Sequence, residues 1–182
     1  NEGIFAAHRD GIVTSASLMV LRDEAPAAAE ALVEYPDLAV GLHLEAGEDL
    51  RRQLDRFRAL VGRDPTHLDS HKHVHEIDPE FGASAVALAA DLGLPLRNRE
   101  IRYERSFYGR DAISPEHLTA LIESLPPGWT EIGCHPAAGS VPISSYDAER
   151  RIELATLRDP GVKSLLNVSD VQLCSFAQVS RL

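Results

Sequence analysis

Short apolar stretches alternate with helical stretches along almost the whole chain, and this alternation limits the possible folds more than any other feature. Six strands are expected, in residues 12–20, 38–44, 66–70, 94–97, 129–134 and 171–176. Helices are expected between them, in residues of about 2–9, 24–33, 48–61, 78–92, 114–125, 147–157 and 162–166. Strands that alternate with helices pair in parallel, and each helix crosses over the sheet. The sequence therefore predicts an α/β fold built on a parallel sheet.

Several element boundaries carry recognisable signals. Asp78 and Ser114 each stand before a proline, which is the order expected for an N-cap and the first helical residue. Gly93 ends the helix that Asp78 begins, and Gly11 suits the left-handed residue that often follows a helix. The run LAVGLHL at 38–44 is almost continuously apolar, as expected for a strand buried on both faces of a parallel sheet.

Composition narrows the class of protein. The chain has 182 residues, of which 44% are hydrophobic and 25% charged, and these are ordinary values for one globular domain. It has 18 basic and 28 acidic residues, so the net charge is −10, and neither nucleic acid nor an anionic membrane surface is an expected partner. No apolar run is long enough to cross a bilayer. The two cysteines have no C-x-x-C spacing, so we expect a reducing, cytoplasmic location.

Three histidines stand where predicted strands end. His43 lies in the last residues of one strand, and His71 and His135 directly follow two others. The C-terminal ends of parallel strands meet on one side of a sheet or barrel, where active sites are usually built. We therefore expect His43 and His71 to bind a metal ion or act in catalysis. His135 is expected to act as a general acid or to orient a reacting group.

The segment from Asp69 to His75 is dense in residues that bind metals. If it is extended, the alternation of side chains places His71, His73 and His75 on one face. If the strand ends earlier, His73 and His75 line the rim or face water. Asp69 can orient a histidine ligand, or it can serve as the third ligand that a catalytic metal site needs.

Other polar residues follow the predicted strands. Arg97 can bind a polar group of a substrate or form an ion pair, and both alternatives stay open. Glu45 and Glu48 follow His43 and can reach the same rim, although Glu48 equally suits the start of a helix. Cys134 precedes His135, but adjacent strand residues point to opposite faces, so a Cys–His nucleophile is not expected.

At these positions the sequence resembles the YdjC-like carbohydrate deacetylases, the family of the ChbG-type chitooligosaccharide deacetylases. The matching stretches are, in family order, Asn1-Glu-Gly-Ile, Asp10-Gly-Ile-Val-Thr-Ser15, Gly41-Leu-His-Leu44, Pro65-Thr-His-Leu-Asp-Ser-His71 with His73-Val-His75, Ser106-Phe-Tyr-Gly109 and Glu131-Ile-Gly-Cys-His-Pro136. The stretch from Pro65 to His75 is the most specific of them.

The resemblance implies a fold and a metal site. The implied fold is an irregular, TIM-like (β/α) barrel of about seven strands, with residues 1–182 as a single domain that lacks its first strand. One divalent metal ion, magnesium or zinc, would be held by His43, His71 and an Asp of an Asp-Asp-Phe-Gly motif expected before Asn1. The neighbouring Asp of that motif is the expected general base. The segment between His43 and His71 is shorter than in the family, which points to a missing stretch at Gly47-Glu48.

The implied activity is metal-dependent removal of the acetyl group from an N-acetylated sugar or oligosaccharide. His135 would give a proton to the leaving amine, and Asp69 would support a histidine ligand. Arg97, His73 and His75 are the expected contacts to the carbohydrate. Two alternatives stay open, namely a metal-dependent phosphoesterase or amidohydrolase and a non-catalytic sugar-binding relative. A homodimer is considered as the assembly.

Overall fold

The computed structural model describes residues 1–140 and 144–179. Its backbone contacts divide the chain into two compact units, each made of segments that are distant in sequence. Unit 1 consists of Asn1–Val13 and Arg102–Leu173, and unit 2 consists of Thr14–Ile101 and Cys174–Leu182. That residues 1–182 form a single domain stays a prediction.

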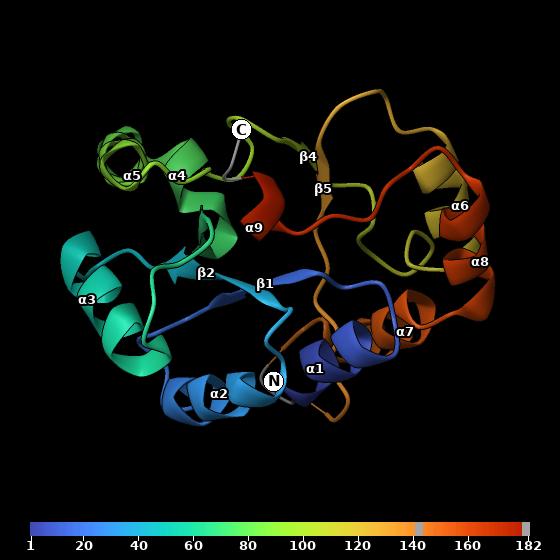
Figure 1. The fold of residues 1–182 in the computed structure, drawn as a ribbon, viewed down its shortest axis with the longest axis horizontal. Coiled ribbons are helices and arrows are strands. Elements are labelled where there is room, and N and C mark those ends of the chain that lie inside the picture. The colour runs from blue at the N-terminus through green and yellow to red at the C-terminus, as the bar shows by residue number, and fades with distance from the viewer. Residues whose placement is uncertain (141–143, 180–182) are drawn as a thin grey trace. The chain divides into compact units, whose positions relative to one another are not determined.

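Unit 2 contains a parallel sheet of three strands, in the order β1 (Ser15–Leu18), β2 (Ala39–Leu44) and β3 (Leu68–Ser70) (Figure 1). The central strand β2 is almost completely buried, as its apolar sequence predicts. The helices described in this unit are α2 (Ala25–Ala31), η1 (Leu32–Glu34), α3 (Leu50–Val61), η2 (His71–His73), α4 (Val74–Ile77), α5 (Pro79–Leu92) and α9 (Phe176–Val179). Both α3 and α9 contact β2, and α3 contacts α2 and α5.

Unit 1 is mainly helical and contains a short parallel pair of strands, β4 (Arg102–Glu104) and β5 (Thr130–Ile132) (Figure 1). Its helices are α1 (Glu2–Arg9), α6 (Pro115–Glu123), α7 (Asp147–Leu157) and α8 (Pro160–Val168). Helix α7 contacts α1 and α6, and α6 contacts α8. Glu153 and Thr156 of α7 are buried polar residues within this unit.

The predicted helix starts at Asp78 and Ser114 are confirmed. The Asp78 side chain accepts hydrogen bonds from the backbone N–H groups of Glu80 and Phe81, and Ser114 accepts one from His117. Gly93 ends α5 in the left-handed conformation, with φ 63°.

The prediction for Gly11 is wrong. This residue is not among those with positive φ, and α1 ends at Asp10 in a right-handed conformation. Gly11 instead lies so close to the carbonyl oxygen of Leu157 that a Cβ atom would collide with it. A glycine after a helix therefore has two possible reasons, and here the reason is close packing against α7.

Two predicted strands differ from the structure, and one observed strand was not predicted. The segment 171–176 forms no strand, because Val171–Ser175 is irregular and Phe176 begins α9. The segment 94–97 is reduced to single bridges, Leu68 with Leu96 and Arg97 with Ile101. Strand β4 was not expected, because Arg102–Glu104 has two charged residues and no apolar run.

The fold is mixed α/β with parallel sheets, as predicted. Within residues 1–140 and 144–179 the strands form two separate sheets, and no closed barrel is present. The seven-stranded barrel is therefore not confirmed.

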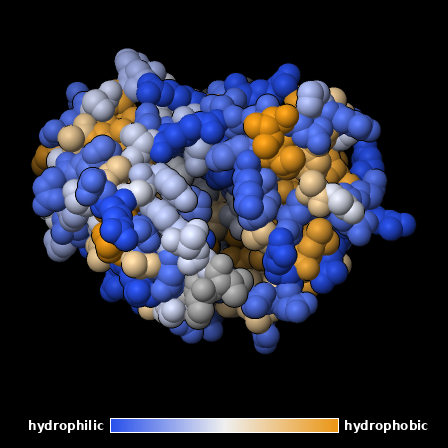
Figure 2. Space-filling model, turned by 180° about the vertical axis from the view of Figure 1, so that it is seen from behind, coloured by the Kyte–Doolittle hydropathy of each residue, from blue (hydrophilic) through white to orange (hydrophobic). Residues whose placement is uncertain are grey.

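Figure 2 shows a face on which hydrophilic side chains predominate, with groups of hydrophobic residues among them. In the part of the chain that the structure describes, every helix is too short or too polar to pass through a bilayer.

Candidate functional site

The register of β2 and β3 brings His43 beside Asp69. The two residues are direct partners in the parallel ladder, so their side chains point to the same side of the sheet. The His43 Nδ1–H donates to Asp69 Oδ1 over 2.7 Å. This hydrogen bond fixes the ring of His43 and leaves its Nε2 lone pair available, which is the arrangement found behind metal-binding histidines.

Asp69 is a buried carboxylate that three donor side chains contact. Besides His43, it accepts a hydrogen bond from the Ser17 hydroxyl over 3.0 Å and lies 2.7 Å from the Arg97 guanidinium. Its side chain is only 1% exposed. Burial by itself would raise the pKa of Asp69, but His43 and then Arg97 outweigh burial and hold that pKa well below its usual range. Asp69 is therefore charged, and both of its oxygens are engaged, so it is placed to orient His43 rather than to bind a metal directly.

The sequence left two roles open for Arg97, namely binding a polar group of a substrate and forming an ion pair. The structure places its guanidinium in an ion pair with Asp69, and the side chain is 15% exposed. Its role as a contact to substrate stays a prediction.

A buried histidine lies behind this pair. His67 Nε2 is 3.1 Å from the Ser17 hydroxyl, and its Nδ1 is 3.0 Å from the Thr66 hydroxyl. The ring stacks on Phe176, with centroids 3.9 Å apart and an interplanar angle of 13°. A Cβ atom on Gly41 would lie 2.5 Å from this ring, so the glycine of the GLHL motif makes room for it. The sequence predicts a structural or exposed His67, and the structure shows it as a buried structural residue. Ser17 was not predicted, because a single serine in a strand carries no functional signal.

Burial lowers the pKa of His67 to about 4. The folded protein therefore holds this histidine neutral, whereas the unfolded chain takes up a proton below about pH 6.5. The contribution of neutral His67 to the free energy of unfolding is complete above pH 6.5. It is lost as the pH falls from 6.5 towards 4.

We expect the free energy of unfolding to fall by about 2 kcal/mol between pH 7 and pH 5 because of His67 alone. Urea unfolding of the wild type and of His67→Gln at both pH values measures this, since the variant should lose that part of the pH dependence. Asp69 does not interfere, because its lowered pKa acts only below about pH 4. An equal pH dependence in the two proteins would contradict the assignment.

His71 lies next to His43 at the end of β3. The two rings meet edge to face, with centroids 5.7 Å apart and an interplanar angle of 75°. Partial burial and then the neighbouring His43 lower the pKa of His71, against the opposing charge of Glu45. The structure thus brings together the two histidines that the sequence predicts as metal ligands, and the lowered pKa favours the neutral imidazole that binds metals.

The chain turns sharply after Ser70, so His71, His73 and His75 do not share an extended face. Lys72 and His73 have left-handed backbones, with φ of 52° and 54°. His75 points inward, with its Nδ1 2.5 Å from the Ser70 hydroxyl and its Nε2 3.1 Å from the Arg97 carbonyl. The substrate-binding roles of His73 and His75 stay predictions. In this structure the His75 side chain connects β3 to the segment that carries Arg97.

Glu45 is the further acidic residue at this end of the sheet. It is 6% exposed, one carboxylate oxygen pairs with Arg22, and Oε2 has no hydrogen-bond partner in the described part of the chain. The buried Gln53 holds the backbone of Glu45 on both sides, accepting from its N–H over 2.9 Å and donating to its carbonyl over 2.8 Å. Sequence reasoning named Glu45 but missed Gln53, which lies on the buried face of α3.

These residues fit a metal ion in part. His43 and His71 offer two imidazoles side by side, and the unpaired buried Oε2 of Glu45 lies at the same strand ends. Among residues 1–140 and 144–179, no three His, Cys, Asp or Glu side chains converge closely enough to form a complete metal site. That His43 and His71 bind a metal ion stays a prediction, and any such site needs at least one further ligand.

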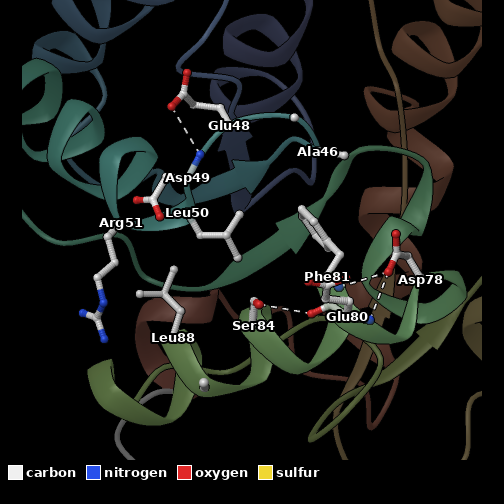
Figure 3. Close-up of a pocket in the computed structure, with 12 residues that line it drawn as sticks. Ala46, Glu48, Asp49, Leu50, Arg51, Asp78, Glu80, Phe81, Ser84 and Leu88 are labelled. Carbon is white, nitrogen blue, oxygen red and sulfur yellow. Dashed lines mark hydrogen bonds between the residues drawn. The ribbon is translucent and has the colours of Figure 1, made fainter.

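A cavity of about 540 Å³ lies between α3, with the segment that precedes it, and α5 (Figure 3). Leu50 and Leu88 face each other across it, and Phe81 stands near Ala46. Its remaining lining residues are Gly47, Glu48, Asp49, Arg51, Asp78, Glu80, Ser84 and Ala87. The side chains of Asp49 and Asp78 accept hydrogen bonds at the first turns of α3 and α5, so they serve as helix caps.

His135 belongs to unit 1 and lies in a second cluster. Its backbone N–H donates to Oε2 of Glu153, a fully buried carboxylate of α7, and its Nδ1 is 3.9 Å from Oε1 of the same residue. The Tyr146 hydroxyl donates to Glu153 Oε1 over 2.8 Å. The His135 ring meets the rings of Tyr108 and Tyr146 edge to face, at 5.7 and 6.0 Å. Sequence reasoning missed Glu153 and Tyr146, since a single Glu in a helix carries no functional signal.

Comparison with known proteins gives a consistent result. The family model of YdjC-like proteins matches residues 1–48 and 45–168. A protein of Geobacillus stearothermophilus named carbohydrate deacetylase is 34% identical over 230 residues, covering 100% of this chain and 93% of that protein. A protein of Yersinia pestis (strain Pestoides F) named chitooligosaccharide deacetylase is 29% identical, covering 97% of this chain and 92% of that protein.

A solved structure is also similar. A crystal structure from Enterococcus faecalis V583, provisionally named a cellobiose-phosphate cleavage protein, matches with a TM-score of 0.87. The match covers 98% of this chain and 92% of that chain at 24% identity, so it shows the fold alone.

The family model matches in two stretches that meet at residues 45–48. This is the place where the sequence predicts a shorter connection than in the family. The cavity beside Ala46–Asp49 thus lies where the two matched stretches join.

Proposed function

The chain belongs to the family of YdjC-like proteins, and on that premise we propose that it removes the acetyl group from an N-acetylated sugar or oligosaccharide. The observation that carries the proposal is the oriented pair of His43 and Asp69 with His71 beside it. Two imidazoles at the ends of parallel strands, one of them held by a buried carboxylate, are typical of hydrolytic metal sites. The names of the relatives support a carbohydrate amide as the substrate.

We propose that His43 Nε2 and the His71 imidazole hold one divalent ion, magnesium or zinc. Such an ion, when bound, polarises the acetyl carbonyl and lowers the pKa of a bound water. Asp69 keeps the Nδ1 proton of His43 in place, so that Nε2 stays a lone-pair donor. Arg97 and Ser17 both hold Oδ2 of Asp69, so its Oδ1 stays directed at His43.

His135 is proposed as the proton donor to the leaving amine, because an amine leaves readily only after its nitrogen is protonated. Its ring is 43% exposed, which leaves it accessible to a substrate. Glu153 supports this role by position, since its buried carboxylate accepts from the His135 backbone N–H and lies 3.9 Å from Nδ1 of the ring.

The proposal includes finer features that the family resemblance implies. The complete fold is proposed to be the irregular TIM-like barrel, supported by the alternation of strands and helices. The low cysteine content, with no C-x-x-C spacing, supports a cytoplasmic location. A homodimer is proposed as the assembly on the resemblance alone.

The direct test is acetate release from N-acetylglucosamine and its short oligomers. The protein is stripped with a chelator and assayed alone and with added magnesium or zinc. We expect acetate only with one of the added metals, and none from fully deacetylated glucosamine oligomers. Equal acetate release with and without metal would contradict the metal-dependent mechanism, and no release from any of these sugars with either metal would contradict the proposed substrate class.

A further inference from the structure

We propose that Tyr108 forms a binding subsite for a sugar ring, on which the apolar face of the ring stacks beside His135. The inference rests on the proposed function and deepens it, because it names a residue that would hold the carbohydrate. It lies entirely within unit 1 and uses none of the predicted metal ligands.

Tyr108 is an exposed aromatic residue with one covered face. Its ring lies parallel to that of Tyr146, with centroids 4.4 Å apart and an interplanar angle of 3°. Tyr108 is nevertheless 56% exposed. A parallel neighbour can cover only one face of a ring, so the exposed area includes the opposite face. A flat aromatic surface open to solvent is the kind of surface that ligand sites use.

The covered side of the pair is held rigidly. The Tyr146 hydroxyl accepts a hydrogen bond from the Gly109 backbone N–H over 3.0 Å and donates to Glu153 over 2.8 Å. Glu153 is fully buried, and burial raises the pKa of Tyr146, so the hydroxyl keeps its proton. The residue that follows Tyr108 is thus anchored to the same side chain on which Tyr108 stacks. A rigid aromatic residue binds a ligand with little loss of conformational entropy.

The same carboxylate fixes His135 beside the aromatic pair. Glu153 accepts from the His135 backbone N–H, and the His135 ring meets the edge of Tyr108 at 5.7 Å and 77°. The imidazole lies at the side of the stacked pair, at 5.7 and 6.0 Å from the two rings, so a sugar on the open face of Tyr108 would turn a substituent of its rim toward it. This placement is what a sugar requires if His135 is to reach the nitrogen that it carries.

The chemistry of the surface favours a sugar over other flat ligands. A pyranose ring presents C–H groups on one face and hydroxyls around its rim, so it can stack on an aromatic ring while its rim stays hydrated or hydrogen-bonded. A nucleic-acid base would bring phosphates to a chain with a net charge of −10. The occupant proposed is therefore an uncharged N-acetylated hexose.

The test compares Tyr108→Phe, Tyr108→Leu and Tyr108→Ala in the full chain. Binding of N,N′-diacetylchitobiose is measured by calorimetry with His71→Ala present in each protein, so that no turnover is needed. Phe keeps the aromatic face and should bind like the parent. Leu keeps apolar volume without the flat ring, and both Leu and Ala should raise Kd by about 3- to 10-fold. Circular dichroism melting confirms that each variant is folded.

The results separate this inference from the proposed function. Acetate release by the wild type together with unchanged binding in folded Leu and Ala variants would overturn the subsite and leave the function standing. Weaker binding in those variants together with no acetate release by the wild type would retain the subsite and overturn the function. Equal weakening by Phe, Leu and Ala would also overturn the stacking proposal, because it would point to the hydroxyl instead of the ring.

Discussion

Alanine in place of His71 is expected to abolish acetate release and to reduce bound metal below one ion per chain. The ring of His71 lies 5.7 Å from that of His43, where β2 and β3 end. Its loss leaves a single imidazole, which cannot hold a catalytic divalent ion. We expect the rate to fall by about a thousandfold, equivalent to about 4 kcal/mol of transition-state stabilisation.

The readouts for His71→Ala are acetate release, metal content by elemental analysis, and the melting temperature. The residue is exposed on the segment after β3, so the fold should tolerate alanine there. His117→Ala is the matched control, because His117 lies on α6 in unit 1 and no catalytic role is proposed for it. Acetate release that survives His71→Ala with the metal content unchanged would contradict the assignment of His71 as a ligand.

The strands and helices that the sequence predicts best are those with a complete local signal. Helix α5 begins at a capped Asp-Pro pair and ends at a left-handed glycine, and both ends are found where they are expected. The segment 171–176 shows the limit of such reasoning. Its alternating apolar residues read as a strand, but Phe176 is used to cover the ring of His67 and begins a helix instead. Tertiary packing of this kind has no signature in a single sequence.

The candidate site could be predicted only where residues follow strands. His43 and His71 were found because strand ends converge, and the structure does place their rings together. The turn at Lys72 and His73 could not be foreseen, because lysine seldom adopts positive φ and the enrichment of histidine there is too weak to mark a turn. Glu153 was equally hidden, since its importance arises from complete burial against a loop that lies 18 residues away from it in sequence.

Asn in place of Asp69 is expected to reduce acetate release by about 10- to 100-fold while leaving part of the metal bound. The substitution keeps the shape of the side chain but replaces one acceptor oxygen with an NH₂ group. In the wild type, Asp69 accepts from His43 on one oxygen and from Arg97 and Ser17 on the other. In either orientation, the NH₂ group of the asparagine therefore points at a hydrogen-bond donor. His43 then loses the hydrogen bond that fixes its ring, and Arg97 loses the full charge of its partner. Because Asp69 is buried, the free energy of unfolding should also fall by about 3 kcal/mol.

Asp64→Asn provides the matched control for this substitution. Asp64 also accepts from an arginine, with its Oδ1 2.6 Å from Arg58 Nε, but its side chain is 60% exposed. Its loss should leave both the free energy of unfolding and the activity nearly unchanged, because solvent screens an exposed pair. Urea unfolding and acetate release are measured for both variants. If Asp69→Asn behaves like Asp64→Asn in both measurements, then the buried carboxylate does not orient His43. If stability falls but the rate per folded, metal-loaded chain is unchanged, then Asp69 supports the fold and not the chemistry.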